Sequence, residues 1–229
     1  MNLINKTPTS NMNTFNGSEA KTRRASQGNE PEIFTDIYRE DTNIAIWQRE
    51  LTETLKQSVD AFLQSNAAFQ ASMTVTPQSA LSSISEALGN KVSLELSKNI
   101  SELVDMFCCL FELQRVGLRL TVLDRAMCPR FHVDKVNCRL VTTFQGVATE
   151  WLSQQSADRS KLGMGSNGQP DNQSGLYKSP QDIQQLNCGE VALLKGELWE
   201  GNENAGLIHR SPSPPEGERR LLLTLDFSY

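Results

Sequence analysis

Two histidines and one aspartate carry the most specific chemical signal in this sequence. The chain of 229 residues contains only two histidines, His132 in the segment FHVD and His209 in the segment GLIHRSP. Along an extended strand, the side chains at positions i and i+2 point to the same face. His132 and Asp134 are therefore expected to project side by side, and His209, on a later predicted strand, is the candidate third ligand of one metal ion.

Two imidazoles and one carboxylate on the same side of a metal ion are the ligand set of non-heme Fe(II) oxygenases. The remaining coordination positions stay free for a co-substrate and for dioxygen. A strand histidine that only bonds a nearby acid is the simpler alternative for an isolated HxD motif. Because both histidines of the chain lie on strands predicted to flank one β core, we expect a metal site, with Fe(II) as the ion and zinc as the alternative.

Two cysteines and a threonine are candidates for the surroundings of this site. Cys128 and Cys138 lie close to FHVD, and Cys138 shares the parity of His132 if the strand is unbroken. A thiolate ligand would shift the preference toward zinc, whereas a cysteine nucleophile with a histidine base would leave Asp134 unexplained. Thr143 is expected to line the pocket. The sequence assigns no catalytic acid or base.

The composition is that of an ordinary globular protein and limits its partners. Hydrophobic residues make up 38% of the chain and charged residues 21%, with a net charge of −5 at pH 7. A nucleic-acid binder usually carries a basic surface, and anionic membranes attract basic segments, so neither partner is expected. The phosphate-binding motif GxxxxGK(S/T) does not occur in the sequence. We expect a small-molecule or protein substrate of unknown identity, and the sequence predicts no oligomeric state.

The cysteines and the apolar segments favour a cytoplasmic protein. The chain has five cysteines and no CxxC pair, so a disulfide framework is not expected. The N-terminal residues lack the apolar segment of a secretory signal. The most apolar stretch, residues 103–123, is interrupted by charged side chains and does not fit a membrane span.

Hydrophobic periodicity predicts helices in the N-terminal half. Residues 1–30 are polar and are predicted to be a disordered tail, and residues 31–116 are predicted to be mainly helical. The basic residues of the tail are expected to face solvent: Lys21, Arg23 and Arg24. Apolar residues at steps of three and four predict helices over residues 42–65, 78–88 and 95–114. Asp41 or Thr42 is the expected N-cap of the first helix.

From Gly117 onward the pattern is that of short strands. Alternation in LRLTVL predicts a strand, and further strands are predicted in RFHVDKV, CRLVTTF, TEWL, EVALLKGELW, GLIHRS and RRLLLTLDF. Residues 153–181 form a long polar loop, which is typical of a lid over a functional site. We therefore predict a single α+β domain over residues 31–229, in which the helices pack on a β core formed by residues 117–229.

Three segments resemble an uncharacterised bacterial family, the DUF1826 proteins: GLRLTVLDRAMCPRFHVDKVNCRLVTTFQGVATEWL, CGEVALLKGELWEGNENAGLIHRSP and GERRLLLTLDF. The resemblance covers residues 30–229. The broader pattern resembles the double-stranded β-helix (jelly-roll) oxygenases that use Fe(II) and 2-oxoglutarate, and it implies that the β core is a jelly roll. In those proteins an HxD motif and a distal histidine hold the metal, which implies metal roles for His132, Asp134 and His209.

The same resemblance implies an anchor for a carboxylate of 2-oxoglutarate. A basic residue on the last strand, beyond the distal histidine, has this role in such oxygenases, and Arg219 and Arg220 occupy that region. Strand alternation lets only one of them point inward, and the sequence leaves the choice between them undecided. Many such oxygenases carry a serine or threonine two residues after the arginine, where this chain has Leu221 and Leu222.

The expected function is that of a non-heme Fe(II) oxygenase with 2-oxoglutarate as its co-substrate. Cupin-type metal modules share the jelly-roll fold and do not use 2-oxoglutarate. A non-catalytic, cupin-like metal-binding protein in zinc or iron homeostasis is therefore the alternative. The identity of the metal and the dependence on redox conditions separate the two functions.

Overall fold

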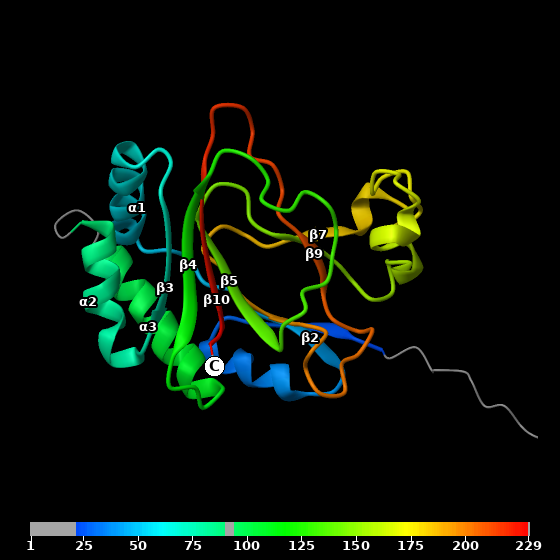
Figure 1. Cartoon of the computed structure of the whole chain (residues 1–229), viewed down its shortest axis with the longest axis horizontal. Coiled ribbons are helices and arrows are strands. Elements are labelled where there is room, and N and C mark those ends of the chain that lie inside the picture. Colours follow the sequence, from blue (N-terminus) through cyan, green and yellow to red (C-terminus); the bar gives the residue numbers. More distant parts are fainter. Residues whose placement is uncertain (1–21, 90–93, 229) are drawn as a thin grey trace, which may run out of the picture.

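A large mixed β-sheet with helices against one face forms the body of the protein (Figure 1). The computed structural model describes residues 22–89 and 94–228. The large sheet has the order β1-β2-β8-β5-β10-β4-β3. Its strands are β1 (Arg24–Gly28), β2 (Thr42–Trp47), β3 (Gln70–Val75), β4 (Val116–Leu123), β5 (Cys138–Gln145), β8 (Val191–Lys195) and β10 (Arg220–Phe227). A smaller sheet has the order β7-β6-β9, with β6 (Glu150–Leu152), β7 (Ile183–Gln185) and β9 (Ile208–Arg210). The prediction of a fold that mixes helices with a large sheet is confirmed.

The long helices lie together on one side of the large sheet (Figure 1). They are α1 (Glu53–Ser65), α2 (Pro77–Leu88) and α3 (Leu94–Leu110), and a 3-10 helix, η1 (Pro31–Tyr38), precedes β2. Residues at the N-terminus of each of the first two α-helices fix where the helix begins. Thr52 caps α1, and Thr76 and Ser79 form a capping box at α2. Among the helices of the described residues, none is long and apolar enough to cross a membrane.

Strand β10 separates two apolar cores. Alternate residues of β10 lie in the core on the helix side: Leu221, Leu223 and Leu225. Leu222 belongs instead to a cluster between the two sheets, together with Trp151 of β6. Because side chains alternate along a strand, Arg220 shares the face of Leu222. The side chain of Arg220 therefore enters the space between the two sheets.

The prediction of one helix over residues 42–65 is wrong in its first half. Residues Thr42–Trp47 form β2, which pairs with β1 and β8, and α1 begins only after its N-cap Thr52. A strand covered on both faces is apolar without a clear alternation, so its apolar residues continued the helical spacing of α1 by coincidence. Neither Asp41 nor Thr42 is a helix N-cap.

The predicted disordered tail does not extend to residue 30. Residues 1–21 lie outside the described part of the chain, but β1 pairs in parallel with β2, and η1 follows it directly. Arg23 was expected to face solvent and is 3% exposed. The segment 31–116, predicted to be mainly helical, also contributes β2 and β3 to the large sheet. Strands β2 and β3 were missed because they pair with strands far along the chain, β8 and β4.

The polar loop over residues 153–181 is folded beside the small sheet. It contains the short 3-10 helices η2 (Arg159–Lys161), η3 (Gly163–Ser166) and the start of η4 (Pro180–Asp182). Leu176 of this loop packs with Phe131, Leu152 and Ile208 in a small apolar core. Figure 1 shows the loop as a lobe next to β7 and β9. That it closes over a pocket when a ligand binds stays a prediction.

Candidate metal centre

His132 and His209 lie opposite each other on two segments that pair through their backbones. The backbone nitrogen of each histidine donates to the carbonyl oxygen of the other, and both distances are 3.0 Å. Residues that oppose each other in an antiparallel pairing carry their side chains on the same face. The centroids of the two imidazole rings accordingly lie 4.6 Å apart. The pairing thus brings together the two histidines of the chain.

The prediction that RFHVDKV forms a strand is wrong. Among the described residues of this segment, only His132 makes a β-bridge. The chain then turns away because its carbonyl groups bond to the loop after β8: Glu197 N donates to Asp134 O at 3.0 Å, and Leu198 N donates to Val136 O at 3.1 Å. Asp134 nevertheless lies beside His132, so a single bridge suffices to place the two side chains together.

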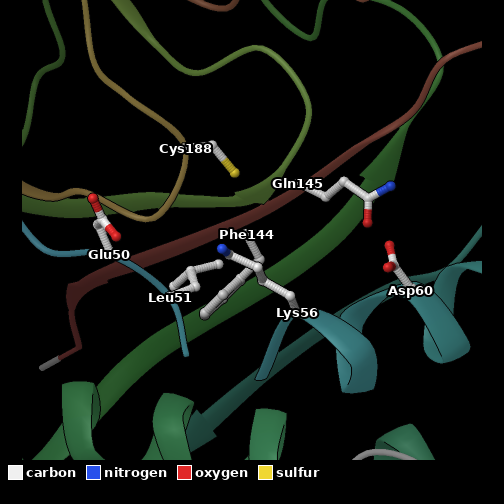
Figure 2. Close-up of a pocket in the computed structure, with 7 residues that line it drawn as sticks. All are labelled: Glu50, Leu51, Lys56, Asp60, Phe144, Gln145 and Cys188. Atoms are coloured by element: carbon white, nitrogen blue, oxygen red, sulfur yellow. The ribbon is translucent and has the colours of Figure 1, made fainter. Parts of the chain in front are cut away.

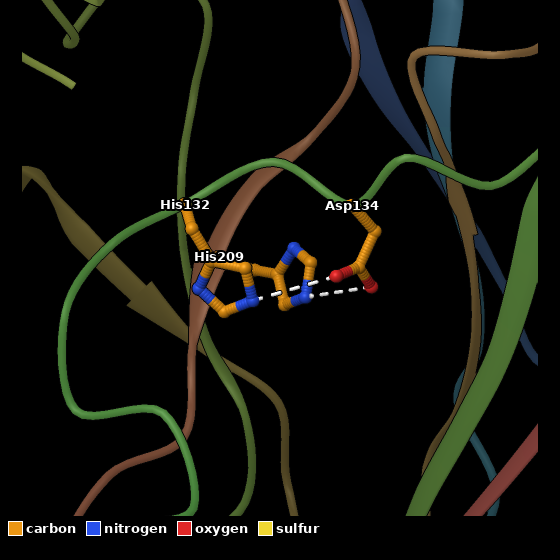
Figure 3. Close-up of side chains that lie close together, drawn as sticks. All are labelled: His132, Asp134 and His209. Atoms are coloured by element: carbon orange, nitrogen blue, oxygen red, sulfur yellow. Dashed lines mark ion pairs between the residues drawn. The ribbon is translucent and has the colours of Figure 1, made fainter. Parts of the chain in front are cut away.

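The carboxylate of Asp134 faces both histidines (Figure 3). Its Oδ1 lies 3.4 Å from Nε2 of His132, and its Oδ2 lies 3.3 Å from Nε2 of His209. One ligand atom from each residue lies within 4.8 Å of the other two. His209 is buried, and His132 and Asp134 are half-buried. Two imidazoles and one carboxylate therefore converge on one small region.

Backbone carbonyl groups fix the orientation of both imidazole rings. Nδ1 of His132 lies 2.9 Å from the carbonyl oxygen of Arg130, and Nδ1 of His209 lies 3.2 Å from that of Leu207. A carbonyl oxygen only accepts, so Nδ1 carries the proton and Nε2 of the neutral ring keeps its lone pair. Metal-binding histidines are commonly oriented by such a bond. Because a lone pair and a carboxylate repel each other, a proton or a metal ion between them stabilises the cluster.

The surroundings of Asp134 favour its charged form. Burial alone would raise its pKa. When Nε2 of each ring is protonated, the hydrogen bonds from His132 and His209 and the positive charges of His209 and Arg139 outweigh burial and hold the pKa of Asp134 well below its ordinary value. The hydrogen bond with Asp134 also raises the pKa of His132, against the opposing effect of burial. Asp134 is therefore ionised, as a metal-binding carboxylate must be.

Arg139 of β5 holds two carboxylates at once. Its Nη1 donates to Oδ2 of Asp134 at 2.5 Å, and its Nε and Nη2 donate to the carboxylate of Asp226 at 2.7 and 3.0 Å. Arg139 and Asp226 are opposite each other in the register of β5 and β10, so the large sheet fixes the orientation of Asp134. Neither Arg139 nor Asp226 was predicted from the sequence to belong to the site. The available signal was that Arg139 alternates with the apolar residues Cys138 and Leu140, which points it to the other face of the sheet.

Arg220 is a buried cation between the two sheets. Its Nη1 donates to Oγ of Ser211 at 2.6 Å and to the carbonyl oxygen of Pro212 at 3.2 Å, and its Nη2 donates to Oγ1 of Thr143 at 3.5 Å. Among the described residues, its Nε has no hydrogen-bond partner. Burial lowers the pKa of Arg220 to about 10, although the charge of Glu150 acts in the opposite direction. A buried cation of this kind is costly unless an anion accompanies it.

The other candidate residues are not part of the cluster of potential metal ligands among the described residues. Arg219 is exposed, so Arg220 is the arginine of this pair that points inward. Cys138 lies in the core on the helix side, where burial raises the pKa of its thiol, and Cys128 is exposed. The parity expected for Cys138 does not apply because the segment after His132 is not a continuous strand. Among the described residues, the cluster of potential metal ligands contains no cysteine.

A hollow of about 320 Å³ lies on the helix side of the large sheet (Figure 2). It is lined by Glu50, Leu51, Lys56, Asp60, Phe144, Gln145 and Cys188. Cys188 donates to the carbonyl oxygen of Thr143 at 3.5 Å, and the lining carries two acidic side chains and one basic side chain. Its lining shares no residue with the cluster of His132, Asp134 and His209, so this hollow is separate from the candidate metal centre.

Several solved structures are similar to this chain at low sequence identity. A dioxygenase for auxin oxidation from rice is 8% identical, with a TM-score of 0.46, over 89% of this chain and 82% of that one. A prolyl-4-hydroxylase from Pseudomonas putida is 10% identical, with a TM-score of 0.45, over 85% and 96%. HygX from Streptomyces hygroscopicus, with nickel and 2-oxoglutarate bound, is 11% identical, with a TM-score of 0.42, over 80% and 81%. Likeness at this level assigns no activity, cofactor or substrate to this chain.

A family model gives the clearest relationship. No curated protein matches the sequence. The model described as "Protein of unknown function (DUF1826)" matches residues 28–226, which include every residue of the candidate metal centre. The match confirms the resemblance that the sequence segments indicated, and the chain belongs to the DUF1826 family.

Proposed function

We propose that this protein is a metal-dependent oxygenase of the non-heme Fe(II) type that uses 2-oxoglutarate. The observation that carries the proposal is the convergence of Nε2 of His132, Nε2 of His209 and the carboxylate of Asp134, with both Nδ1 atoms held by backbone carbonyl groups. Two histidines and one carboxylate with free positions opposite them are the ligand set of such oxygenases.

The proposal includes a double-stranded β-helix, or jelly roll, as the fold of the β core. The two sheets share an apolar cluster, in which Val141 and Leu222 of the large sheet accompany Trp151 of the small sheet. Both sheets also contribute to the candidate site, because His209 lies on β9 and Asp134 is held by Arg139 of β5. A site at which two sheets meet supports this fold, since ligand sites commonly lie in the mouths of β-barrels.

The distances support a single metal ion held by the three residues. Bonds of about 2.1 Å from one ion to two ligands at a right angle separate the ligand atoms by about 3 Å. The nitrogen–oxygen distances of 3.4 Å at His132 and 3.3 Å at His209 lie close to that value. His132, Asp134 and His209 would hold the ion. Fe(II) suits this set, and zinc is the alternative because imidazole and carboxylate groups also bind zinc.

We assign the anchoring of a carboxylate of 2-oxoglutarate to Arg220. A guanidinium group pairs with a carboxylate through two parallel hydrogen bonds, and Nε of Arg220 is without a partner among the described residues. Its guanidinium also contacts Ser211, two residues after His209, which places the charge near the strand of the distal histidine. The hydroxyl of Thr143 lies beside the same group and would assist it.

Bound Fe(II), with the keto acid and dioxygen, would supply the oxidation of an unreactive C–H bond. The part of this chain is to prepare the site. Arg139 orients Asp134 in its ionised form, and the carbonyl groups of Arg130 and Leu207 turn Nε2 of each histidine toward the ion. The apolar cluster between the sheets keeps water away from the anchor, which strengthens its interaction with an anion.

Titration of the Fe(II)-loaded protein with 2-oxoglutarate in the absence of oxygen tests this function. We expect a metal-to-ligand charge-transfer band that saturates with the keto acid. Metal binding without this band, and without affinity for the keto acid, would contradict the oxygenase. That result would instead support the alternative, a non-catalytic metal-binding protein in zinc or iron homeostasis. Elemental analysis of the protein as purified without oxygen identifies the ion.

A further inference from the structure

Another cavity, whose lining includes neither histidine, is lined by two buried cations. Its volume is about 240 Å³, and it is formed by the residue before β1, by η1 with the turn that follows it, and by the loop after β8. Arg23 and Lys195 line it together with the aromatic rings of Tyr38 and Trp199. A volume below the range of drug-sized sites indicates a small ligand.

Lys195 is the more deeply buried of the two cations. Its side chain ends β8 and is 2% exposed. Its Nζ donates to the carbonyl oxygen of Arg39 at 2.9 Å and lies 4.9 Å from the centre of the Trp199 ring. An ammonium group has three N–H donors, so among the described residues this group retains capacity for a further acceptor.

Arg23 is 3% exposed and bonds only to neutral acceptors among the described residues. Its Nε donates to Oδ1 of Asn202 at 2.8 Å, its Nη1 to the carbonyl oxygen of Thr22 at 3.1 Å, and its Nη2 to that of Gly201 at 3.1 Å. Neither Arg23 nor Lys195 forms an ion pair with a carboxylate of the described residues. Buried charges are normally paired, so two positive charges in one cavity require an explanation.

The two cations oppose each other electrostatically. Burial and then the charge of Arg23 lower the pKa of Lys195 to about 8, although Cys138, Asp41 and Glu40 act in the opposite direction. An anion between the two cations would remove this repulsion. The two carboxylates of the lining, those of Glu40 and Glu200, belong to exposed residues, whereas Arg23 and Lys195 are buried.

We propose that the cavity lined by Arg23 and Lys195 binds a small oxyanion. Guanidinium groups bind phosphate, sulfate and carboxylate through paired N–H donors, and an ammonium group adds a point charge. The lining favours a compact ligand, because the carboxylates of Glu40 and Glu200 would repel a larger polyanion. This site is independent of the candidate metal centre.

Thermal unfolding of the full chain with sodium phosphate, sulfate or acetate at constant ionic strength tests the site. We expect at least one anion to raise the Tm of the unmodified protein by several degrees in a saturable manner. Lys195→Met should abolish this response, and Arg24→Met, which removes an exposed neighbouring charge, should retain it. Phosphate and sulfate also stabilise proteins in general, and the non-saturable rise in Tm that remains in Lys195→Met measures that contribution. Phosphate or sulfate binding without acetate binding identifies a tetrahedral anion, and acetate binding identifies a carboxylate.

Tryptophan fluorescence provides a second measurement that does not depend on the stability of a lysine variant. Because Trp199 lies against Lys195, the bound anion should change its emission. We expect a saturable change in the unmodified protein that is lost in Trp199→Phe. The absence of a saturable response to all three anions in the unmodified protein would overturn the proposal. So would an unchanged response in Lys195→Met, since the anion would then bind elsewhere, as at Arg220.

Discussion

The guanidinium of Arg139 lies 2.5 Å from Oδ2 of Asp134, the carboxylate that faces both histidines of the candidate metal centre. The other two bonds of the guanidinium go to Asp226 on the neighbouring strand. Arg139 therefore transmits the rigid geometry of the large sheet to a carboxylate that lies on an irregular segment. In this arrangement Arg139 is a positioning residue, because it reaches the metal centre only through Asp134.

Substitution of Arg139 should weaken metal binding without removing a ligand. We expect Arg139→Ala to lower the affinity for Fe(II) by about 10-fold to 100-fold, the range found when a residue that orients a ligand is removed. Competition with a chelator of known affinity measures the change. The control is Arg119→Ala, an exposed arginine on β4 of the same sheet. Equal affinities of the two variants would show that Asp134 is oriented without Arg139.

The two neighbouring arginines at the start of β10 should differ sharply in their effect on 2-oxoglutarate. Arg220→Ala should lower its affinity by about 100-fold, which corresponds to the few kcal/mol of a charge-assisted hydrogen-bonded pair. Arg219→Ala should leave the affinity unchanged because Arg219 is exposed. Arg220→Lys should restore the affinity only in part, since lysine keeps the charge and loses the paired donors. Loss of binding in Arg219→Ala would reverse the assignment.

The sequence predicted the proximity of the site residues better than it predicted their secondary structure. The i and i+2 spacing of His132 and Asp134 was sufficient because one bridge to His209 orients the segment, although the predicted strand does not form. Arg139 and Asp226 could not be paired from the sequence, because their contact depends on the register of β5 and β10. Local spacing therefore identifies neighbours along the chain, whereas register decides which distant residues support them.

The errors in the N-terminal half have one physical origin. Strand β2 is covered on both faces, so its composition lacks the alternation that marks a half-exposed strand. Strand β1 is short and polar, and it is ordered by its pairing with β2. By contrast, α2 was predicted within one residue of its start because Pro77 and Gly89 mark its ends locally. Elements that depend on distant partners were missed, and elements with local signals were found.

The loop over residues 153–181 should stabilise the histidine pair through Asp171. The carboxylate of Asp171 accepts from Phe131 N at 2.8 Å and from Nε of Arg130 at 3.2 Å, directly before His132. Asp171→Ala should lower the free energy of unfolding by about 1–3 kcal/mol, because it leaves a buried backbone donor without its partner. Denaturation in urea measures this change. Asp158→Ala, in an exposed cap of the same loop, is the control, and an equal effect of both variants would contradict a specific role for Asp171.

Sulfate binding at the cavity of Arg23 and Lys195 should weaken as pH rises through about 8, the pKa of Lys195. The anion requires the charged ammonium group, so affinity is highest below this pH and should fall severalfold between about pH 7 and about pH 9. Other residue types do not account for a change in this range, because arginine side chains titrate above about pH 12 and carboxyl groups at about pH 4. Burial raises the pKa of the Cys138 thiol and of the Tyr38 hydroxyl. Fluorescence titrations at a series of pH values measure the affinity. A constant affinity would show that Lys195 does not contact the anion.

The metal content of the protein tests the central claim most directly. Protein purified without oxygen and loaded with Fe(II) should contain one metal ion per chain by elemental analysis. The variant that combines His132→Ala and His209→Ala should contain none after removal of free metal, because Asp134 alone cannot hold the ion. Circular dichroism confirms that the variant remains folded. A folded double variant that retains one ion per chain would contradict the assignment of the metal centre to His132, Asp134 and His209.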